Sequence, residues 1–183
     1  MAALLASFYG ALGSNSTGAS LLENCLVYTG NADLAPEAIA HSNEFLFTPK
    51  GAPNLGLSNQ WQYVKFEVTS VPAGKNMLCY IDNSSIETIE LFDINNGMAH
   101  IGTTGSTVGN GIDYSTPSGF AIDIPEKAGH YLLRLKSSKQ LIAPIYLGDS
   151  NQILTMAGKE DAIMFLYFGI IAVLFFYNLF LAV

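Results

Sequence analysis

The chain has 183 residues, of which 50% are hydrophobic and 13% charged, and its formal net charge at pH 7 is −7. Its eight Lys and Arg residues are scattered singly, so no basic stripe is available to neutralise phosphates. These numbers argue against a nucleic-acid partner and against binding to anionic lipid headgroups. About 160 residues precede a C-terminal apolar segment, which suits one domain plus one anchor.

The first 20 residues divide into an apolar run and a polar linker. Met1 to Gly13 is about as long as the core of a signal peptide but has no basic n-region. Two interpretations stay open, an export signal and an ordinary short helix at the ragged end of a gene fragment. Ser14 to Ser20 reads SNSTGAS and predicts a linker, so the folded domain is expected to start near Leu21.

Short apolar or alternating runs separated by turn residues predict an all-β domain over residues 21–150. In chain order, strands are expected at 25–28, 44–48, 61–69, 77–82, 86–94, 98–102, 120–124, 129–136 and 141–147, with one helical turn at 36–41. Roughly nine or ten strands are too many for one open sheet of this size, so two packed sheets are expected.

Three segments of this domain carry further information. Trp61 to Thr69 alternates between apolar and polar residues with one slip at Tyr63-Val64, which predicts one buried face and one wet face. Ile86 to Ile94 is apolar on both faces and is expected to be a central strand. Residues 103–118 form a long polar loop with four Gly, and such loops often carry recognition.

No cofactor or metal site is expected, because His41, His100 and His130 are isolated from one another and from cysteine. Cys25 and Cys79 permit one disulfide outside the cytoplasm, but their spacing in sequence says nothing about their distance in space. A bridge and a pair of free buried thiols therefore both stay open.

The C-terminal segment, Ala162 to Val183, contains no charged residue and makes a helix of roughly 33 Å, enough to cross a hydrocarbon core of about 30 Å. The alternative is a buried core helix of a soluble protein, which would be apolar on one stripe only or shorter. The preceding Lys159, Glu160 and Asp161 are net acidic, which places the β-rich domain on the outer side. Residues 151–161 are expected to form a helical neck, and the absence of flanking basic residues suggests that further spans are missing.

Several parts of the chain, taken in order, resemble the 7TMR-DISM family, the bacterial seven-transmembrane receptors with diverse intracellular signalling modules, in its second, jelly-roll type of extracellular domain. No single part is specific, but their order, spacing and position before a span carry the resemblance. The matching parts are Asn54 to Ser58, Tyr63 to Phe66, Ile81 to Asn83, Ile86 to Phe92, Tyr131 to Leu135, Ala143 to Leu147, Phe168-Gly169 and Tyr177 to Phe180. The family commonly has Trp where this chain has Tyr63, and the only Trp here is two residues earlier.

The resemblance implies a jelly-roll-like β-sandwich, similar to carbohydrate-binding domains, followed by a transmembrane helix that is the first of seven. It also implies an inner-membrane receptor whose N-terminal domain is periplasmic or extracellular, with a cytoplasmic output such as a histidine kinase or a diguanylate cyclase. The expected partners are the lipid bilayer, a small-molecule or carbohydrate ligand, and a second copy bound through the neck and transmembrane segments.

No catalytic residue is predicted, because the acidic residues are spread over strands and turns without a recognisable constellation. Sugar binding would use an exposed aromatic ring with Asp, Asn or Gln to bond the hydroxyls. The candidate ligand-binding residues are Gln60, Trp61, Gln62, Tyr63, Asp82, Asn110 and Asp113. The alternative is that Trp61 and Tyr63 belong to the sandwich core and that Asp82 shapes a turn.

Arg134 stands alone on an apolar strand and is interpreted as a paired structural charge rather than an anion receptor, because isolated buried charge is costly. The favoured function is an extracytoplasmic ligand-sensing domain of a signal-transduction receptor. The alternatives are a membrane-anchored adhesion or structural module without signalling output, and a membrane-tethered hydrolase.

Overall fold

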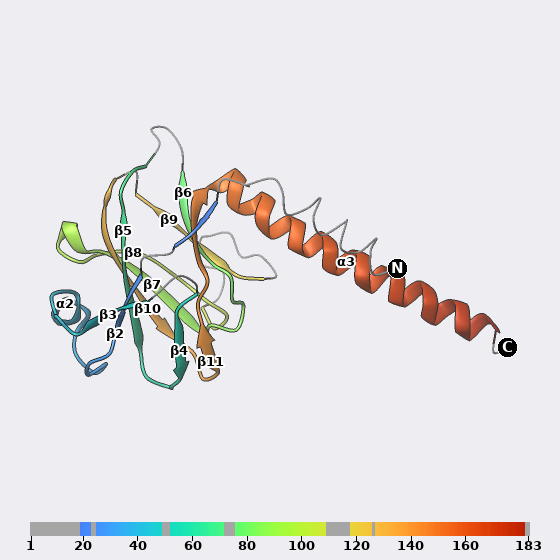
Figure 1. Ribbon diagram of the computed structural model, residues 1–183, viewed down its shortest axis with the longest axis horizontal. Helices are drawn as coiled ribbons and strands as arrows, with labels where there is room; N and C mark the ends of the chain where they lie inside the picture. Colours follow the sequence, from blue (N-terminus) through green and yellow to red (C-terminus); the bar gives the residue numbers. More distant parts are fainter. Residues whose placement is uncertain are drawn as a thin grey trace.

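The computed structural model describes residues 19–22, 25–48, 52–71, 76–108, 118–125 and 127–181, which form a β-sandwich and one long C-terminal helix (Figure 1). The strands are β1 (Ser20–Leu21), β2 (Cys25–Tyr28), β3 (Phe45–Thr48), β4 (Asn54–Leu57), β5 (Gln62–Val68), β6 (Met77–Ile81), β7 (Thr88–Asp93), β8 (Ala99–Thr104), β9 (Phe120–Ile124), β10 (Gly129–Lys136), β11 (Gln140–Ile142) and β12 (Ile145–Asp149). The helices are α2 (Pro36–Ala40), the 3-10 turn η1 (Ile94–Asn96) and α3 (Ser150–Leu181).

Two sheets make the sandwich, as expected from the number of strands. Sheet A has the strand order β1-β12-β6-β9, and sheet B has the order β3-β2-β5-β10-β7-β8. Neighbouring strands in both sheets pair antiparallel. The inner faces of the two sheets bury one apolar core, which includes Phe66 of β5, Ile122 of β9 and Leu133 of β10. Apolar burial of this kind is the main force that holds two sheets together.

Strand β5 alternates regularly, without the slip that the sequence predicts at Tyr63-Val64. Val64, Phe66 and Val68 point into the inter-sheet core, whereas Tyr63 lies with Trp61 in a second cluster on the outer face of sheet B. The apparent slip arises because both faces of the strand start with apolar residues. The outer face of β5 is thus apolar at its beginning and polar further along, at Lys65 and Glu67.

The expected strand at 141–147 is wrong in one respect, because Ala143-Pro144 divides it. The first part, β11, pairs with β4 in a small two-stranded sheet, and the second part, β12, crosses to sheet A beside β6. Proline has no N–H to donate to a ladder, so it favours a break between strands. The chain thereby changes sheets within two residues.

The outer face of sheet B carries the second apolar cluster, which α2 covers. Ile39 and Ala40 of α2 are fully buried against Tyr28, Tyr63 and Leu132, which come from β2, β5 and β10. Pro36 starts this short helix, where its missing N–H costs nothing. Sheet B is therefore covered on part of its outer face and open on the rest.

Helix α3 begins directly after β12 and is fixed to sheet A by a reciprocal cap. The Asp149 carboxylate accepts a hydrogen bond from the Gln152 backbone N–H, and the Gln152 side-chain oxygen accepts one from the Asp149 N–H, each at 2.9 Å. Such a capping box satisfies orphan donors at both positions. Ile153 and Ala157, which are 1% and 2% exposed, then pack on Leu78 and Tyr80 of the outer face of sheet A.

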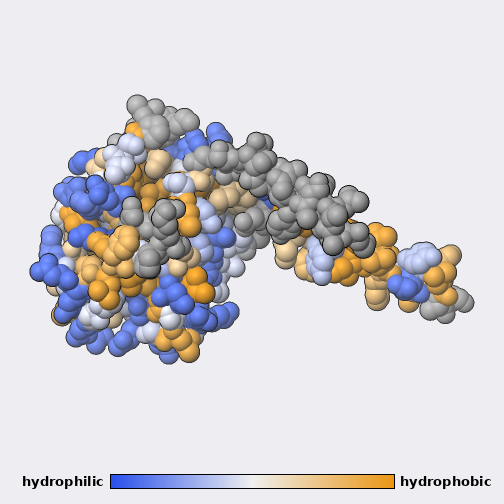
Figure 2. All heavy atoms as spheres, viewed as in Figure 1, coloured by the Kyte–Doolittle hydropathy of each residue, from blue (hydrophilic) through white to orange (hydrophobic). Residues whose placement is uncertain are grey.

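Beyond these first turns α3 leaves the sandwich and continues as one unbroken helix to Leu181 (Figure 1). Its described side chains from Met164 onward are exposed and almost entirely apolar, and Figure 2 shows hydrophobic residues along this projecting part. Helix α3 is long enough and apolar enough to cross a membrane. A buried core helix of a soluble domain does not fit this exposure.

The disulfide that the sequence left open is not formed. Cys25 and Cys79 are both free and lie buried in the inter-sheet core. Burial raises the pKa of the Cys25 thiol to about 11 and raises the pKa of the Cys79 thiol as well. Both thiols are therefore neutral apolar core groups at physiological pH.

Candidate ligand-binding face

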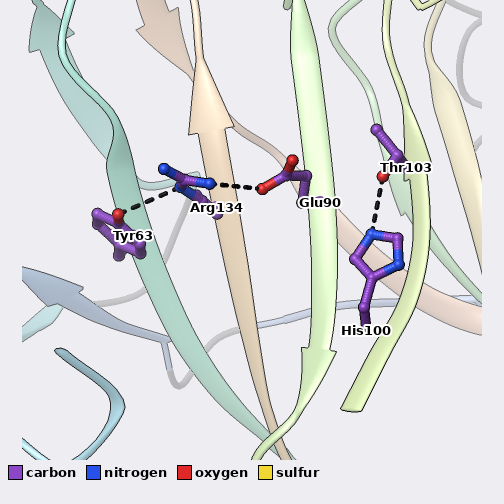
Figure 3. Close-up of polar contacts among 5 residues, drawn as sticks. All are labelled: Tyr63, Glu90, His100, Thr103 and Arg134. Carbon is purple, nitrogen blue, oxygen red and sulfur yellow. Dashed lines mark hydrogen bonds and ion pairs between the residues drawn. The ribbon is translucent and has the colours of Figure 1, made fainter. Parts of the chain in front are cut away.

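Four strands of sheet B place one polar row on its outer face. The strand register sets Arg134 of β10 opposite Tyr63 of β5 and Glu90 of β7, and Glu90 opposite Thr103 of β8. Because side chains alternate along a strand, residues in register share a face. Figure 3 shows these side chains side by side across the sheet, with His100 beside Thr103.

Arg134 is the hub of this row. Its Nε donates to the Tyr63 hydroxyl at 3.2 Å, and its Nη1 donates to the Glu90 carboxylate at 3.0 Å (Figure 3). The Arg134 and Glu90 side chains are 23% and 21% exposed, so the pair is partly shielded from water. At the end of the row, His100 and Thr103 are joined by a hydrogen bond at 2.8 Å. The interpretation of Arg134 as a paired charge is confirmed.

The only Trp of the chain stacks on its only Arg. The Arg134 guanidinium carbon lies 3.8 Å from the centre of the Trp61 ring, and the Lys136 ammonium lies 5.5 Å from it. Trp61 precedes β5, so that it neighbours the end of β10 that carries Lys136. A cation against the face of an indole ring is attracted by its quadrupole. The stack fixes the orientation of Trp61.

A pocket of about 390 Å³ opens beside Trp61. It exists because β2 pairs with β5 over only Leu26 and Val27 and then diverges from it. Its walls are the end of β2 with the following loop, the start of β4, and the segment entering β5. The lining residues are Val27, Tyr28, Thr29, Gly30, Ala32, Asn54, Leu55, Gln60, Trp61, Gln62 and Tyr63.

An acidic group contacts Tyr28, which lines the β2 end of this pocket. The Tyr28 hydroxyl donates to the Glu44 carboxylate at 3.1 Å, and Thr29 donates to the Glu44 backbone carbonyl at 3.2 Å. The Tyr28 ring meets Tyr63 edge to face, with ring centres 6.1 Å apart. Burial and the Glu44 carboxylate raise the pKa of the Tyr28 hydroxyl, which stays a hydrogen-bond donor at neutral pH.

The structure brings together four of the seven predicted site residues. Gln60, Trp61, Gln62 and Tyr63 all line the pocket. Gln60 is exposed and Trp61 and Gln62 are half-buried, while the Tyr63 side chain is fully buried in the second cluster and reaches the row through its hydroxyl. The alternative expectation was that Trp61 and Tyr63 belong to the sandwich core, but neither lies in the core between the two sheets.

The other three residues do not join this site. Asp82 lies at the end of β6 in sheet A, where it accepts a hydrogen bond from Tyr80 at 3.3 Å beside the cluster under α3. The turn after it is shaped by Asn83, whose side chain accepts from the Ser85 N–H at 2.9 Å. Asn110 and Asp113 lie outside the described residues.

Sequence reasoning missed Glu90, Thr103 and His100 as companions of Trp61, and placed Arg134 outside the site. A usable signal was present in the alternation of β7 and β10, which puts Glu90 and Arg134 on the faces opposite to Leu91 and Leu133. Only the pairing register of β7 and β10 shows that Glu90 and Arg134 are direct neighbours on one face of the sheet. Among the residues that the structure describes, no three His, Cys, Asp or Glu side chains gather closely enough to hold a metal ion.

A β-sandwich that presents a polar, pocketed face and passes directly into one membrane-length helix has the architecture of an extracellular domain of a membrane-anchored receptor. The model of the family 7TMR-DISM extracellular 2 matches residues 29–149, and the chain belongs to this family. The match begins directly after β2 and runs from β3 to β12, and it includes all of the pocket residues except Val27 and Tyr28. Comparison with curated proteins finds no match.

Proposed function

We propose that this domain is the ligand-sensing part of a bacterial signal-transduction receptor in the inner membrane, with the sandwich in the periplasm. The ligand is a carbohydrate that binds in the pocket beside Trp61. The observation that carries the proposal is that Trp61, Gln60 and Gln62 line one opening. An indole ring takes the apolar face of a pyranose, and amides donate to and accept from its hydroxyls.

The position of the pocket supports a sensor rather than an enzyme. The pocket lies where β2 diverges from β5 in sheet B, whereas α3 is fixed to the outer face of sheet A. A ligand at Trp61 is therefore remote from the helix and acts on it only through the packed core between the sheets. Close-packed cores transmit strain because they have few voids.

The start of α3 suits the transmission of such a change. The capping box at Asp149 and Gln152 and the buried Ile153 and Ala157 join the helix to sheet A without a flexible linker. We infer that ligand binding shifts the population between two arrangements of the sandwich and thus between two positions of α3. A ligand with equal affinity for both arrangements would not signal, however tightly it bound.

Trp61 provides the test, because it is the only Trp in the chain. The full chain, placed in lipid nanodiscs that contain no sugar-headed detergent, is titrated with a panel of mono- and oligosaccharides while Trp emission is recorded. A binding sugar is expected to shift or quench the emission in a saturable way and to raise the midpoint of thermal unfolding. The variants Gln60→Ala and Gln62→Ala are expected to weaken binding, whereas Glu67→Gln, at an exposed position of β5 outside the pocket lining, serves as the control.

Uniform absence of a response across the panel would remove the carbohydrate hypothesis. A second readout separates a receptor from the anchored adhesion module, which is the alternative function. Spin labels on α3 report its position with and without sugar. Binding with no change at α3 would favour the adhesion module, and binding with a change would favour the receptor.

A further inference from the structure

The surroundings of Trp61 are unusually cationic for this chain. Arg134 and Lys136, two of the eight basic residues in a chain of net charge −7, both lie against the indole ring. Glu90 pairs with Arg134, and in the described part of the structure Lys136 has no carboxylate within salt-bridge distance. Beside Trp61, Arg134 is therefore paired with a carboxylate, whereas Lys136 is not paired and only interacts at longer range with the Glu87 carboxylate.

Trp61 separates these charges from the pocket interior. The ring lines the pocket, and neither Arg134 nor Lys136 is among the residues that line it. The guanidinium thus lies behind the ring, 3.8 Å from its centre. The bonds to Tyr63 and Glu90 occupy only part of its N–H donors. A cation behind an aromatic ring makes the opposite face a poorer site for a second cation.

Building on the proposed function, we propose that the Trp61 pocket selects acidic sugars, of the uronate class, over neutral sugars and over amino sugars of the same shape. Arg134 and Lys136 set this preference, and Glu90 limits it. The carboxylate of a uronate stacked on Trp61 extends past the edge of the ring toward Lys136. The protonated amine of an amino sugar is repelled from the same position.

The opposite end of the pocket, at Tyr28, has a carboxylate nearby and therefore the opposite charge. Glu44 lies there behind the lining residue Tyr28, whose hydroxyl donates to it at 3.1 Å, and its charge favours the hydroxyl hydrogens of any sugar as well as an amine. The pocket is therefore positive at Trp61 and negative at Tyr28. A ligand with its acid group at Trp61 and its hydroxyls at Glu44 matches both ends, whereas an amino sugar matches only the Glu44 end.

The test uses three sugars that share one ring and differ in charge, namely glucuronate, glucose and glucosamine, with the galacto series run in parallel. Ligand-observed NMR on the full chain in nanodiscs measures the dissociation constants. Partly screened charges at this range change affinity by a factor of about three to ten. Glucuronate is expected to bind that much more tightly than glucose, and glucosamine more weakly. The differences should shrink at high salt.

Single charge removals identify the residues responsible. Lys136→Gln and Arg134→Gln are each expected to reduce the ratio of glucuronate to glucose affinity, and Glu90→Gln is expected to increase it. Lys127→Gln removes one positive charge from an exposed loop away from the pocket and should leave the ratio unchanged. Lys136→Gln keeps the test decisive if Arg134→Gln fails to fold, because the Lys136 side chain makes no hydrogen bond within the described part of the structure.

Three results would overturn the proposal. Equal affinities for the three sugars, or a ratio that Lys136→Gln leaves unchanged, would show that the charges behind Trp61 do not select the ligand. Tightest binding of glucosamine, lost in Glu44→Gln, would show that the Glu44 end dominates. In these cases sugar binding itself stands. Binding of none of the sugars in either series, together with a silent wider panel, would overturn the carbohydrate proposal as well.

Discussion

At two turns beside sheet B the backbone conformation favours glycine, and at Gly105 there is also no space for a side chain. Gly105 has a φ of +134°, and a Cβ at this position would lie 2.4 Å from the Glu87 carbonyl oxygen. Gly97 also has a positive φ, +63°, but nothing lies within 4 Å of its Cβ position. Gly105→Ala is therefore expected to destabilise the domain by about 3 kcal/mol or more, and Gly97→Ala by about 1 kcal/mol.

Urea unfolding followed by Trp61 emission measures both variants. The two glycines form a matched pair, because both need the left-handed region and only Gly105 also lacks space. Similar midpoints for the two variants would show that the backbone at Glu87 moves aside at little cost.

The buried thiols predict a pH dependence. Burial raises the pKa of Cys25 to about 11 and raises that of Cys79 too, whereas thiols of the unfolded chain ionise near pH 8.5. Above about pH 8.5 the unfolded state therefore loses protons that the folded state keeps, so stability is fully present below this pH and falls as the pH rises toward 11.

The thermal midpoint of the wild type is expected to decline between pH 8 and pH 10 more steeply than that of the double variant Cys25→Ala/Cys79→Ala. The variant starts lower, because each substitution removes buried atoms, but its curve is flatter. Parallel curves would show that the folded protein does not hold these two thiols protonated above the pKa of the unfolded chain.

Among the elements, the first turns of α3 carry the connection between sandwich and membrane. Ile153 is 1% exposed against sheet A, while its neighbour Leu154 is 41% exposed. Ile153→Ala is expected to weaken helix docking by about 2 kcal/mol or more, and Leu154→Ala by much less. Hydrogen exchange of the amides at 150–158 measures this as roughly thirtyfold faster exchange for Ile153→Ala. Equal protection in both variants would show that the cap at Asp149 alone holds the helix.

The same elements show how far the sequence leads. Strands 25–28, 120–124 and 129–136 are predicted to the residue, because each is an apolar run bounded by polar or turn residues. β1 was not recognised as a strand, since two residues are too short for a periodic signal, and β4 was missed because Asn and Gly, which make up half of NLGL, are depleted in strands. The division at Pro144 was missed because the apolar character of residues 141–147 is continuous across it.

At the scale of the whole molecule, the candidate site is half predictable. Gln60 to Tyr63 are contiguous, so a search for aromatic and amide residues finds them in one segment. Arg134 and Glu90 come from strands distant in sequence, and their place beside Trp61 follows from the register of β5, β10 and β7. Asp82 follows β6 in sheet A, away from the other candidates, and the sequence does not show which sheet a strand joins.

The arrangement of the whole molecule predicts where Trp61 lies relative to the bilayer. α3 is docked on sheet A, and α2, which covers the outer face of sheet B, lies at the far side of the sandwich from α3 (Figure 1). With α3 crossing the membrane, the Trp61 pocket is expected to face away from the lipid. Trp61 emission in nanodiscs should therefore be quenched by aqueous acrylamide and be unaffected by lipids brominated in their acyl chains.

A control tryptophan within α3 makes this measurement decisive. In the variant Trp61→Phe/Tyr177→Trp the only Trp lies in the apolar, exposed part of α3, so brominated lipids are expected to quench it strongly and acrylamide weakly. If α3 holds the sandwich away from the bilayer, the two proteins therefore show opposite sensitivities to acrylamide and to brominated lipid. Quenching of Trp61 by brominated lipid would mean that sheet B lies on the membrane surface. The pocket would then face lipid, and a water-soluble sugar would not have free access to it.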